Sequence, residues 1–150
     1  MKHFLAAVAV ILAGLPAFAS DDDLMMVKSS SDVASTMDRL EAAVTAAGAN
    51  VMARVDHAAG AASVDMDLSP TQVLIFGNPN IGTRAMQDDP RAGLFLPMKV
   101  LVYQDSEGQT WLAYQDPENM FDDLEIDDDA DYIKMMASAL DKLTAKAAMQ

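Results

Sequence analysis

The chain has 150 residues, and its 10 Lys and Arg residues against 23 Asp and Glu give a formal net charge of −13. A chain this acidic repels phosphate backbones and anionic lipid headgroups, which excludes nucleic acid and membrane surfaces as partners. It contains no cysteine, so disulfides and thiolate-based zinc sites are excluded as well.

The N-terminus has the pattern of a secretory signal peptide. A basic start at Lys2 precedes the apolar run Phe4–Leu15, and Ala17-Phe18-Ala19 matches the small-x-small pattern that signal peptidase cleaves. The apolar run is shorter than the roughly 20 residues that cross a bilayer. We therefore predict a signal peptide over residues 1–19, a single domain over residues 20–150, no membrane insertion after cleavage, and a periplasmic or secreted protein.

The first part of this domain predicts a strand and then a helix. Leu24–Lys28 is apolar enough for a strand, and Asp32 is a suitable N-cap for the helix that follows. Apolar residues recur at helical spacing on one face, and Gly48 provides a C-cap. The residues of this apolar stripe are Val33, Met37, Leu40, Val44 and Ala47.

From residue 51 the apolar period changes to two. Val51, Ala53, Val55 and His57 would share one face of a half-buried strand that ends within residues 58–62. The short apolar run Gln72–Phe76, bounded by proline and glycine, is typical of a central strand.

The last part predicts a hairpin and a second helix. Lys99–Gln104 and Gln109–Gln115 are β-rich runs joined by a short turn in which Gly108 can adopt the left-handed conformation. The closing helix has an apolar stripe made of Ile133, Met136, Leu140 and Leu143. Strands clustered between an early and a late helix predict a single α+β domain of order β-α-β4-α, with a mainly antiparallel sheet.

One glycine-rich segment follows the central strand. Gly77-x-x-x-x-Gly82-Thr83 lacks the lysine that a phosphate-binding P-loop needs, so nucleotide hydrolysis is rejected. A short helix over residues 80–87 would still leave backbone amides free for a small anion. The alternative, which we favour, is that Gly77, Pro79 and Gly82 only shape a tight turn.

Two residue types deserve consideration as sites. His57 is the single histidine left after signal cleavage, too few for a multi-histidine zinc site, but its ordinary pKa suits acid–base chemistry. Twelve methionines in an exported chain invite a copper(I) interpretation, because thioethers are soft ligands. Methionine is also common core filler, and the sequence contains no dense Met-x-x-Met cluster.

Several segments resemble one family in the right order. They are Gly48–His57, Leu74–Thr83, Asp89–Tyr103 and Gly108–Pro117. On these the chain resembles the domain-of-unknown-function 302 family. The resemblance implies a fold similar to the TATA-binding-protein superfamily, and pairing as a homodimer. It also matches His57, Asn78, Pro79, Pro97 and Lys99 to signature positions of the family.

The sequence leaves three functions open. The leading hypothesis is a non-enzymatic exported module that binds a small ligand or a protein partner, with His57, Asn78, Arg84 and Lys99 as the ligand-binding cluster. The alternative is an enzyme in which His57 is the general acid or base, aided by a carboxylate such as Asp56. The third is soft-metal handling through methionines. No cofactor and no conventional metal site are predicted.

Overall fold

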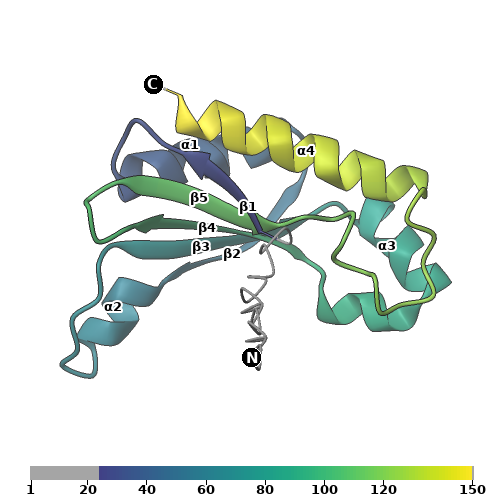
Figure 1. Cartoon of the computed structure of the whole chain (residues 1–150), viewed down its shortest axis with the longest axis horizontal. Helices are drawn as coiled ribbons and strands as arrows, with labels where there is room; N and C mark the ends of the chain where they lie inside the picture. Colours follow the sequence, from purple (N-terminus) through teal and green to yellow (C-terminus); the bar gives the residue numbers. More distant parts are fainter. Residues whose placement is uncertain (1–23, 150) are drawn as a thin grey trace, which may run out of the picture.

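The computed structural model describes residues 24–149, so the predicted signal peptide over residues 1–19 lies outside the described residues. The elements form a five-stranded sheet with helices between its strands and a last helix after them (Figure 1). In chain order they are β1 (Leu24–Lys28), α1 (Val33–Ala46), β2 (Asn50–Asp56), α2 (His57–Ala62), β3 (Thr71–Gly77), α3 (Pro79–Asp88), the 3-10 helix η1 (Pro90–Leu94), β4 (Met98–Gln104), β5 (Thr110–Gln115) and α4 (Asp131–Ala148).

The sheet is antiparallel throughout, with strand order β1-β5-β4-β3-β2. β3 therefore lies inside the sheet, which confirms the central strand predicted from its apolar run. Gly108 lies in the turn of the β4–β5 hairpin. Its φ of +80° is a left-handed conformation, which glycine adopts without strain. The predicted α+β order β-α-β4-α is confirmed, with α2, α3 and η1 as insertions between strands.

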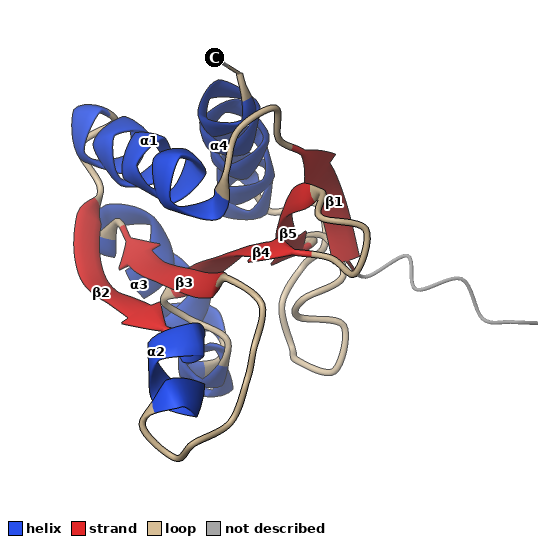
Figure 2. Ribbon diagram, turned by 90° about the vertical axis from the view of Figure 1, so that its left-hand side faces the viewer, coloured by secondary structure: helices blue, strands red, loops and turns tan. Residues whose placement is uncertain are grey.

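Helices α1 and α4 pack against each other and cover one face of the sheet (Figure 2). Asp32 caps α1 by accepting a hydrogen bond from the Ser35 amide. Four residues of its predicted apolar stripe, Val33, Met37, Leu40 and Val44, are buried, whereas Ala47 is the exposed C-cap residue after the helix. The four apolar residues predicted for the last helix are also buried in α4. The core is closed by alternate residues of the strands, such as Leu74, Val100 and Leu112. Within residues 24–149, no helix is both long enough and apolar enough to span a membrane.

The other face of the sheet lies away from α1 and α4, and we call it the open face (Figure 2). The strand pairing places Met26, Ala113, Leu101, Val73 and Val55 in one row across all five strands. Neighbouring rows add Trp111, Tyr103 and Ile75 together with the charged Lys28 and Lys99. The row is mainly apolar although several of its side chains contact solvent.

Two predictions for the β2 region are wrong. A β-bulge between Val51 and Ala53 pairs Val51 with buried Phe76 but Ala53 with Ile75, so Val51 lies on the helix side and Ala53 on the open face. His57 does not extend the strand, because Asp56 caps a new helix by accepting a hydrogen bond from the Ala59 amide. His57 is therefore the first residue of α2, and it is exposed.

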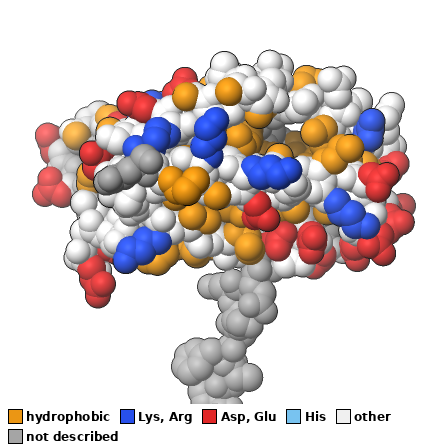
Figure 3. All heavy atoms as spheres, turned by 90° about the horizontal axis from the view of Figure 1, so that it is seen from above, with side chains coloured by type: hydrophobic (Ala, Val, Ile, Leu, Met, Phe, Trp, Pro, Cys, Tyr) orange, Lys and Arg blue, Asp and Glu red, His pale blue; other side chains and the backbone are white. Residues whose placement is uncertain are grey.

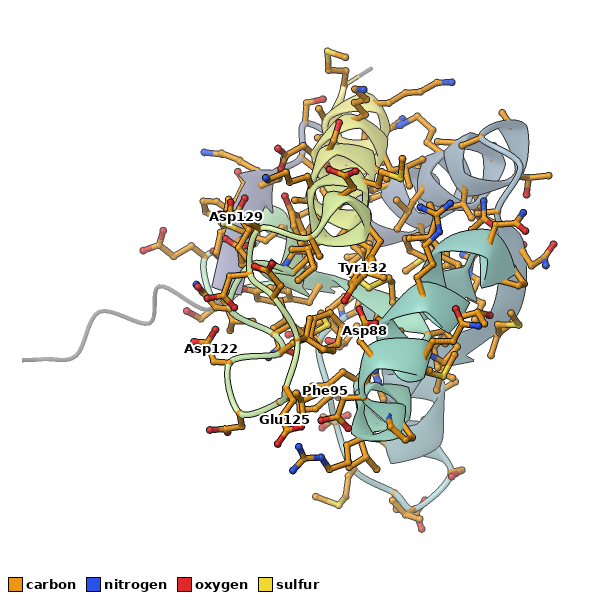
Figure 4. The ribbon with its side chains drawn as sticks, turned by 90° about the vertical axis from the view of Figure 1, so that its right-hand side faces the viewer. Asp88, Phe95, Asp122, Glu125, Asp129 and Tyr132 are labelled. Carbon is orange, nitrogen blue, oxygen red and sulfur yellow. The ribbon has the colours of Figure 1, made fainter. Side chains whose placement is uncertain are left out.

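The acidic segment over residues 116–130 is fixed to the body of the domain by two polar contacts. Buried Asp89 forms an ion pair with Arg91 and accepts a hydrogen bond from the Glu125 amide. Tyr132 at the start of α4 points toward Asp88 at the end of α3 and donates a hydrogen bond of 2.6 Å to it (Figure 4). These contacts hold the acidic segment beside α3 and η1.

Candidate functional site

A mainly apolar cavity of the described residues lies at one end of the sheet, on the helix side. It has a volume of about 370 Å³. Its walls come from the end of β3, helix α3, the Gly93–Pro97 loop and helix α4, with Ala47, Ala49 and Met52 closing the remaining side. In Figure 3, which views the helix side, hydrophobic side chains border a hollow in the upper right half of the surface.

The cavity is mainly apolar. Among the residues that the structure describes, none that lines it is charged, and Asn78 and Thr83 are its polar side chains. The acidic side chains instead gather at the right-hand end of the molecule in Figure 3. Two glycines belong to the wall and lie close to the opposite loop: a Cβ at Gly77 would meet Pro97, and one at Gly82 would meet Leu96, each at an ordinary contact distance of 3.5 Å. Such a pocket suits an uncharged, compact ligand.

The turn from β3 into α3 does not provide an anion site. Asn78 caps α3, and its side-chain oxygen accepts a hydrogen bond from the Asn80 amide. The amides of Ile81 and Gly82 both donate to the Asn78 carbonyl, and Pro79 has no N–H. The amide groups that an anion would need are already bonded. Gly82 also lies inside α3 rather than in the tight turn that the sequence predicted.

The structure does not bring the four predicted ligand-binding residues together. His57 follows β2 at the end where Asp56 pairs with Gln72, whereas Asn78 follows β3 at the opposite end of the sheet. Seven residues of strand separate the two ends, which is roughly 20 Å at the usual rise. Of the four, Asn78 alone lines the cavity.

The remaining two predicted residues, Lys99 and Arg84, lie in different places. Lys99 lies on the open face, where its Nζ donates to the carbonyls of Phe95 and Pro97 at 3.0 and 3.3 Å. It therefore fixes the loop behind the cavity. Arg84 is exposed on α3 and does not line the cavity. The expected cluster is wrong as a single site, because strand direction and sheet face separate its members.

Comparison with known proteins identifies the family. The family model described as "Domain of unknown function DUF302" matches residues 25–143. The chain belongs to the DUF302 family. A crystal structure of a DUF302 protein from Bacillus stearothermophilus superimposes with a TM-score of 0.67, at 23% identity, covering 85% of this chain and 96% of that one. This likeness supports the fold of the domain.

Curated relatives of this DUF302 chain are longer proteins. "Fluoride-specific ion channel FluC 1" of Brucella suis biovar 1 (strain 1330) is 44% identical over 111 residues, which is 73% of this chain and 44% of the relative. "Fluoride-specific ion channel FluC 1" of Brucella abortus biovar 1 (strain 9-941) matches equally over 41% of its length. The chain therefore spans less than half of the relatives that it matches.

Two buried tyrosines contribute to the electrostatics of the DUF302 domain near α4. Burial, reinforced by a hydrogen bond to Asp88, raises the pKa of Tyr132 to about 12. Burial likewise raises the pKa of Tyr114 to about 12, and its hydroxyl donates to Asp141. The hydrogen bonds from Arg91 hold the pKa of Asp89 well below its usual range. These groups stabilise the fold beside the cavity and do not line it.

Sequence reasoning missed the cavity of this DUF302 domain. Its walls come from segments that are far apart in the chain and become neighbours only through the strand pairing and the packing of α4. Four of the twelve methionines, Met52, Met86, Met98 and Met136, line it together. A search for dense methionine motifs could not detect them, because each belongs to a different element.

Proposed function

We propose that this DUF302 domain is a non-enzymatic module that binds a compact, mainly apolar small molecule in the cavity between α3 and α4. The cavity itself is the observation that carries the proposal. Its volume of about 370 Å³ is at the lower end of the range typical of small-molecule sites, roughly 300–1,000 Å³. The polar side chains of Asn78 and Thr83 can orient one hydrogen-bonding group of the ligand.

The test compares two tryptophan substitutions on the same helix. Ala139 lines the cavity and is exposed at its edge, so Ala139→Trp should block the cavity without disturbing the core. Ala145 is exposed on α4 but does not line the cavity, which makes Ala145→Trp the control. The probe is indole, and its binding is measured by thermal unfolding and by isothermal titration calorimetry.

Indole should stabilise the wild-type protein and the Ala145→Trp variant but not Ala139→Trp. At 100 times its Kd, a ligand adds about 2.7 kcal/mol to the free energy of unfolding, which is several degrees in Tm for a domain of this size. Equal binding by both variants would place the apolar site elsewhere. No stabilisation of the wild-type protein by indole or by a panel of similar apolar molecules would contradict the proposal.

A second candidate function rests on the relatives. We infer that the domain acts beside a fluoride-specific channel, because relatives with that name contain a segment 44% identical to this chain within less than half of their length. A channel must cross the membrane, and residues 24–149 hold no helix suited to that. The channel activity of those relatives would therefore belong to the remainder of their chains.

Reconstitution tests this second candidate. A fluoride-specific channel is placed in liposomes, and fluoride efflux is measured with and without the purified domain. A changed efflux rate, together with sedimentation of the domain with channel-containing vesicles, supports a role at the channel. An unchanged rate without co-sedimentation contradicts it. The apolar cavity argues against fluoride itself as its ligand, since a small hydrated anion would lose its water there.

We also propose that the protein is exported and forms a homodimer through its open face. Support for the dimer comes from the charges of that face: its strand positions carry Lys28 and Lys99 and no carboxylate, although the chain has 23 acidic residues. Two acidic copies can therefore meet there without direct repulsion between carboxylates. Leu101 lies centrally in this face, on β4.

Analytical ultracentrifugation tests the dimer. The wild-type protein should sediment as a dimer at micromolar concentration, and Leu101→Glu should be a monomer. Ala42→Glu, on the exposed surface of α1, is the control and should leave the dimer intact. A wild-type protein that remains monomeric at 100 µM would contradict this proposal.

A further inference from the structure

The convergence of methionines at the cavity is the feature that the binding of an apolar molecule does not require. Met52 comes from β2, Met86 from α3, Met98 from β4 and Met136 from α4. Met98 and Met136 are buried, with 7% and 5% of their surface exposed, whereas Met52 and Met86 are 53% and 39% exposed. Two thioethers therefore lie inside the cavity and two lie toward its opening.

The donor chemistry of this wall is restricted to soft ligands. No histidine, aspartate or glutamate is among the residues described as lining the cavity, and the sequence has no cysteine. Residues 24–149 also contain no group of three or more such side chains that could hold a metal ion. Neutral, polarisable thioethers favour Cu(I) and similar soft ions over Zn²⁺, Ca²⁺ or Mg²⁺.

The dimensions allow these thioethers to meet. A sphere with the volume of this cavity is roughly 9 Å across, and a methionine side chain has three rotatable bonds with which to reach its centre. The Met86 sulfur packs beside Gly93, where an added Cβ would meet it at an ordinary contact distance of 3.5 Å. The net charge of −13 also favours the approach of a cation over that of an anion.

We propose that the cavity binds a soft monovalent metal ion, Cu(I) or its analogue Ag(I), through the thioethers of Met86, Met98 and Met136, with Met52 at the opening. This site uses the same cavity as the proposed apolar ligand but does not depend on that ligand. The ion is held by coordination to sulfur, with no redox step. Its binding excludes an apolar molecule from the same space.

The experiment distinguishes coordination by methionine sulfur from the apolar shape of the cavity. Leucine has nearly the volume and polarity of methionine but no donor atom, so methionine-to-leucine changes keep the cavity apolar. The cavity variant combines Met52→Leu, Met86→Leu, Met98→Leu and Met136→Leu. The control variant changes four exposed methionines that do not line the cavity: Met25→Leu, Met66→Leu, Met135→Leu and Met149→Leu.

The probes are Ag(I) alone, observed by native mass spectrometry and thermal unfolding, and Cu(I) measured against a competing chelator. The wild-type protein and the control variant should bind one ion per chain, and the cavity variant should bind at least 10-fold more weakly. Equal affinity in the cavity variant, loss of affinity in the control variant, or absence of binding to the wild-type protein would each overturn the proposal. Binding of indole by the cavity variant keeps this test distinct from that of the apolar ligand.

A second measurement covers the case in which four core changes prevent folding. X-ray absorption of the Cu(I)-loaded wild-type protein should show a first coordination shell of sulfur. A shell of nitrogen or oxygen would overturn the proposal. The single change Met86→Leu, at a partly exposed side chain, should fold normally and weaken Ag(I) binding several-fold, whereas unchanged binding would remove Met86 from the site.

Discussion

Replacing Gly82 with alanine should stabilise the domain. Gly82 lies inside α3, and a glycine in a helix interior costs about 1 kcal/mol relative to alanine because its backbone loses more conformational entropy. Its new Cβ would meet the Leu96 side chain at 3.5 Å, an ordinary van der Waals contact. We therefore expect the free energy of unfolding to rise by about 0.5–1 kcal/mol, with a rise in Tm of about 2–4 °C.

The assay is urea unfolding followed by circular dichroism, together with thermal unfolding. The matched control is Gly108→Ala, where no atom lies within 4 Å of the new Cβ but φ is +80°. Its left-handed backbone should lower the free energy of unfolding by about 1–2 kcal/mol. If Gly82→Ala were destabilising to the same degree as Gly108→Ala, residue 82 would not be in an unstrained helix, and the wall of the cavity would be arranged differently.

Three further predictions follow from the packing and the charges. Leu140→Ala, at a core side chain that is 1% exposed, should lower the free energy of unfolding by about 2–5 kcal/mol in urea, and a loss below about 1 kcal/mol would contradict the packing of α4. Because the pKa values of Tyr114 and Tyr132 are raised to about 12, their contribution to stability is complete below about pH 10 and is lost as the pH rises toward 12. In a titration followed by absorbance at 295 nm, Tyr114→Phe and Tyr132→Phe should each lack one of the two late tyrosine titrations. Titration of either tyrosine near pH 10 in the wild-type protein would refute the assignment. Asp89→Asn should speed hydrogen exchange over residues 116–130 while α1 stays protected, and unchanged exchange in that segment would mean that Asp89 does not anchor it.

Local patterns in the sequence predict most of the fold. The apolar stripes of α1 and α4, the Asp32 cap and the turn at Gly108 each depend on residues close together in the chain, and the structure confirms them, apart from exposed Ala47 at the end of the first stripe. The face of β2 was wrong because a bulge depends on the partner strand and leaves no period of its own. His57 was misplaced because Asp56 can end a strand and cap a helix equally well.

The site was less predictable for a related reason. Polar residues such as His57 and Lys99 attract attention in a sequence, but strand direction and sheet face separate them. The cavity instead depends on methionine, glycine and proline side chains, which sequence patterns assign to the core or to turns. Only the pairing register and the position of α4 show that Met52 and Met136 share a wall.

The pairing of the two ends of the domain has a consequence for its synthesis. β1 pairs with β5, and α1 packs on α4, so the core cannot close until residue 148 has left the ribosome. Until then the side of α1 that packs on α4 stays uncovered, and contacts between distant residues slow the final folding step. Any truncation within α4 should therefore yield an aggregating fragment rather than a smaller folded domain.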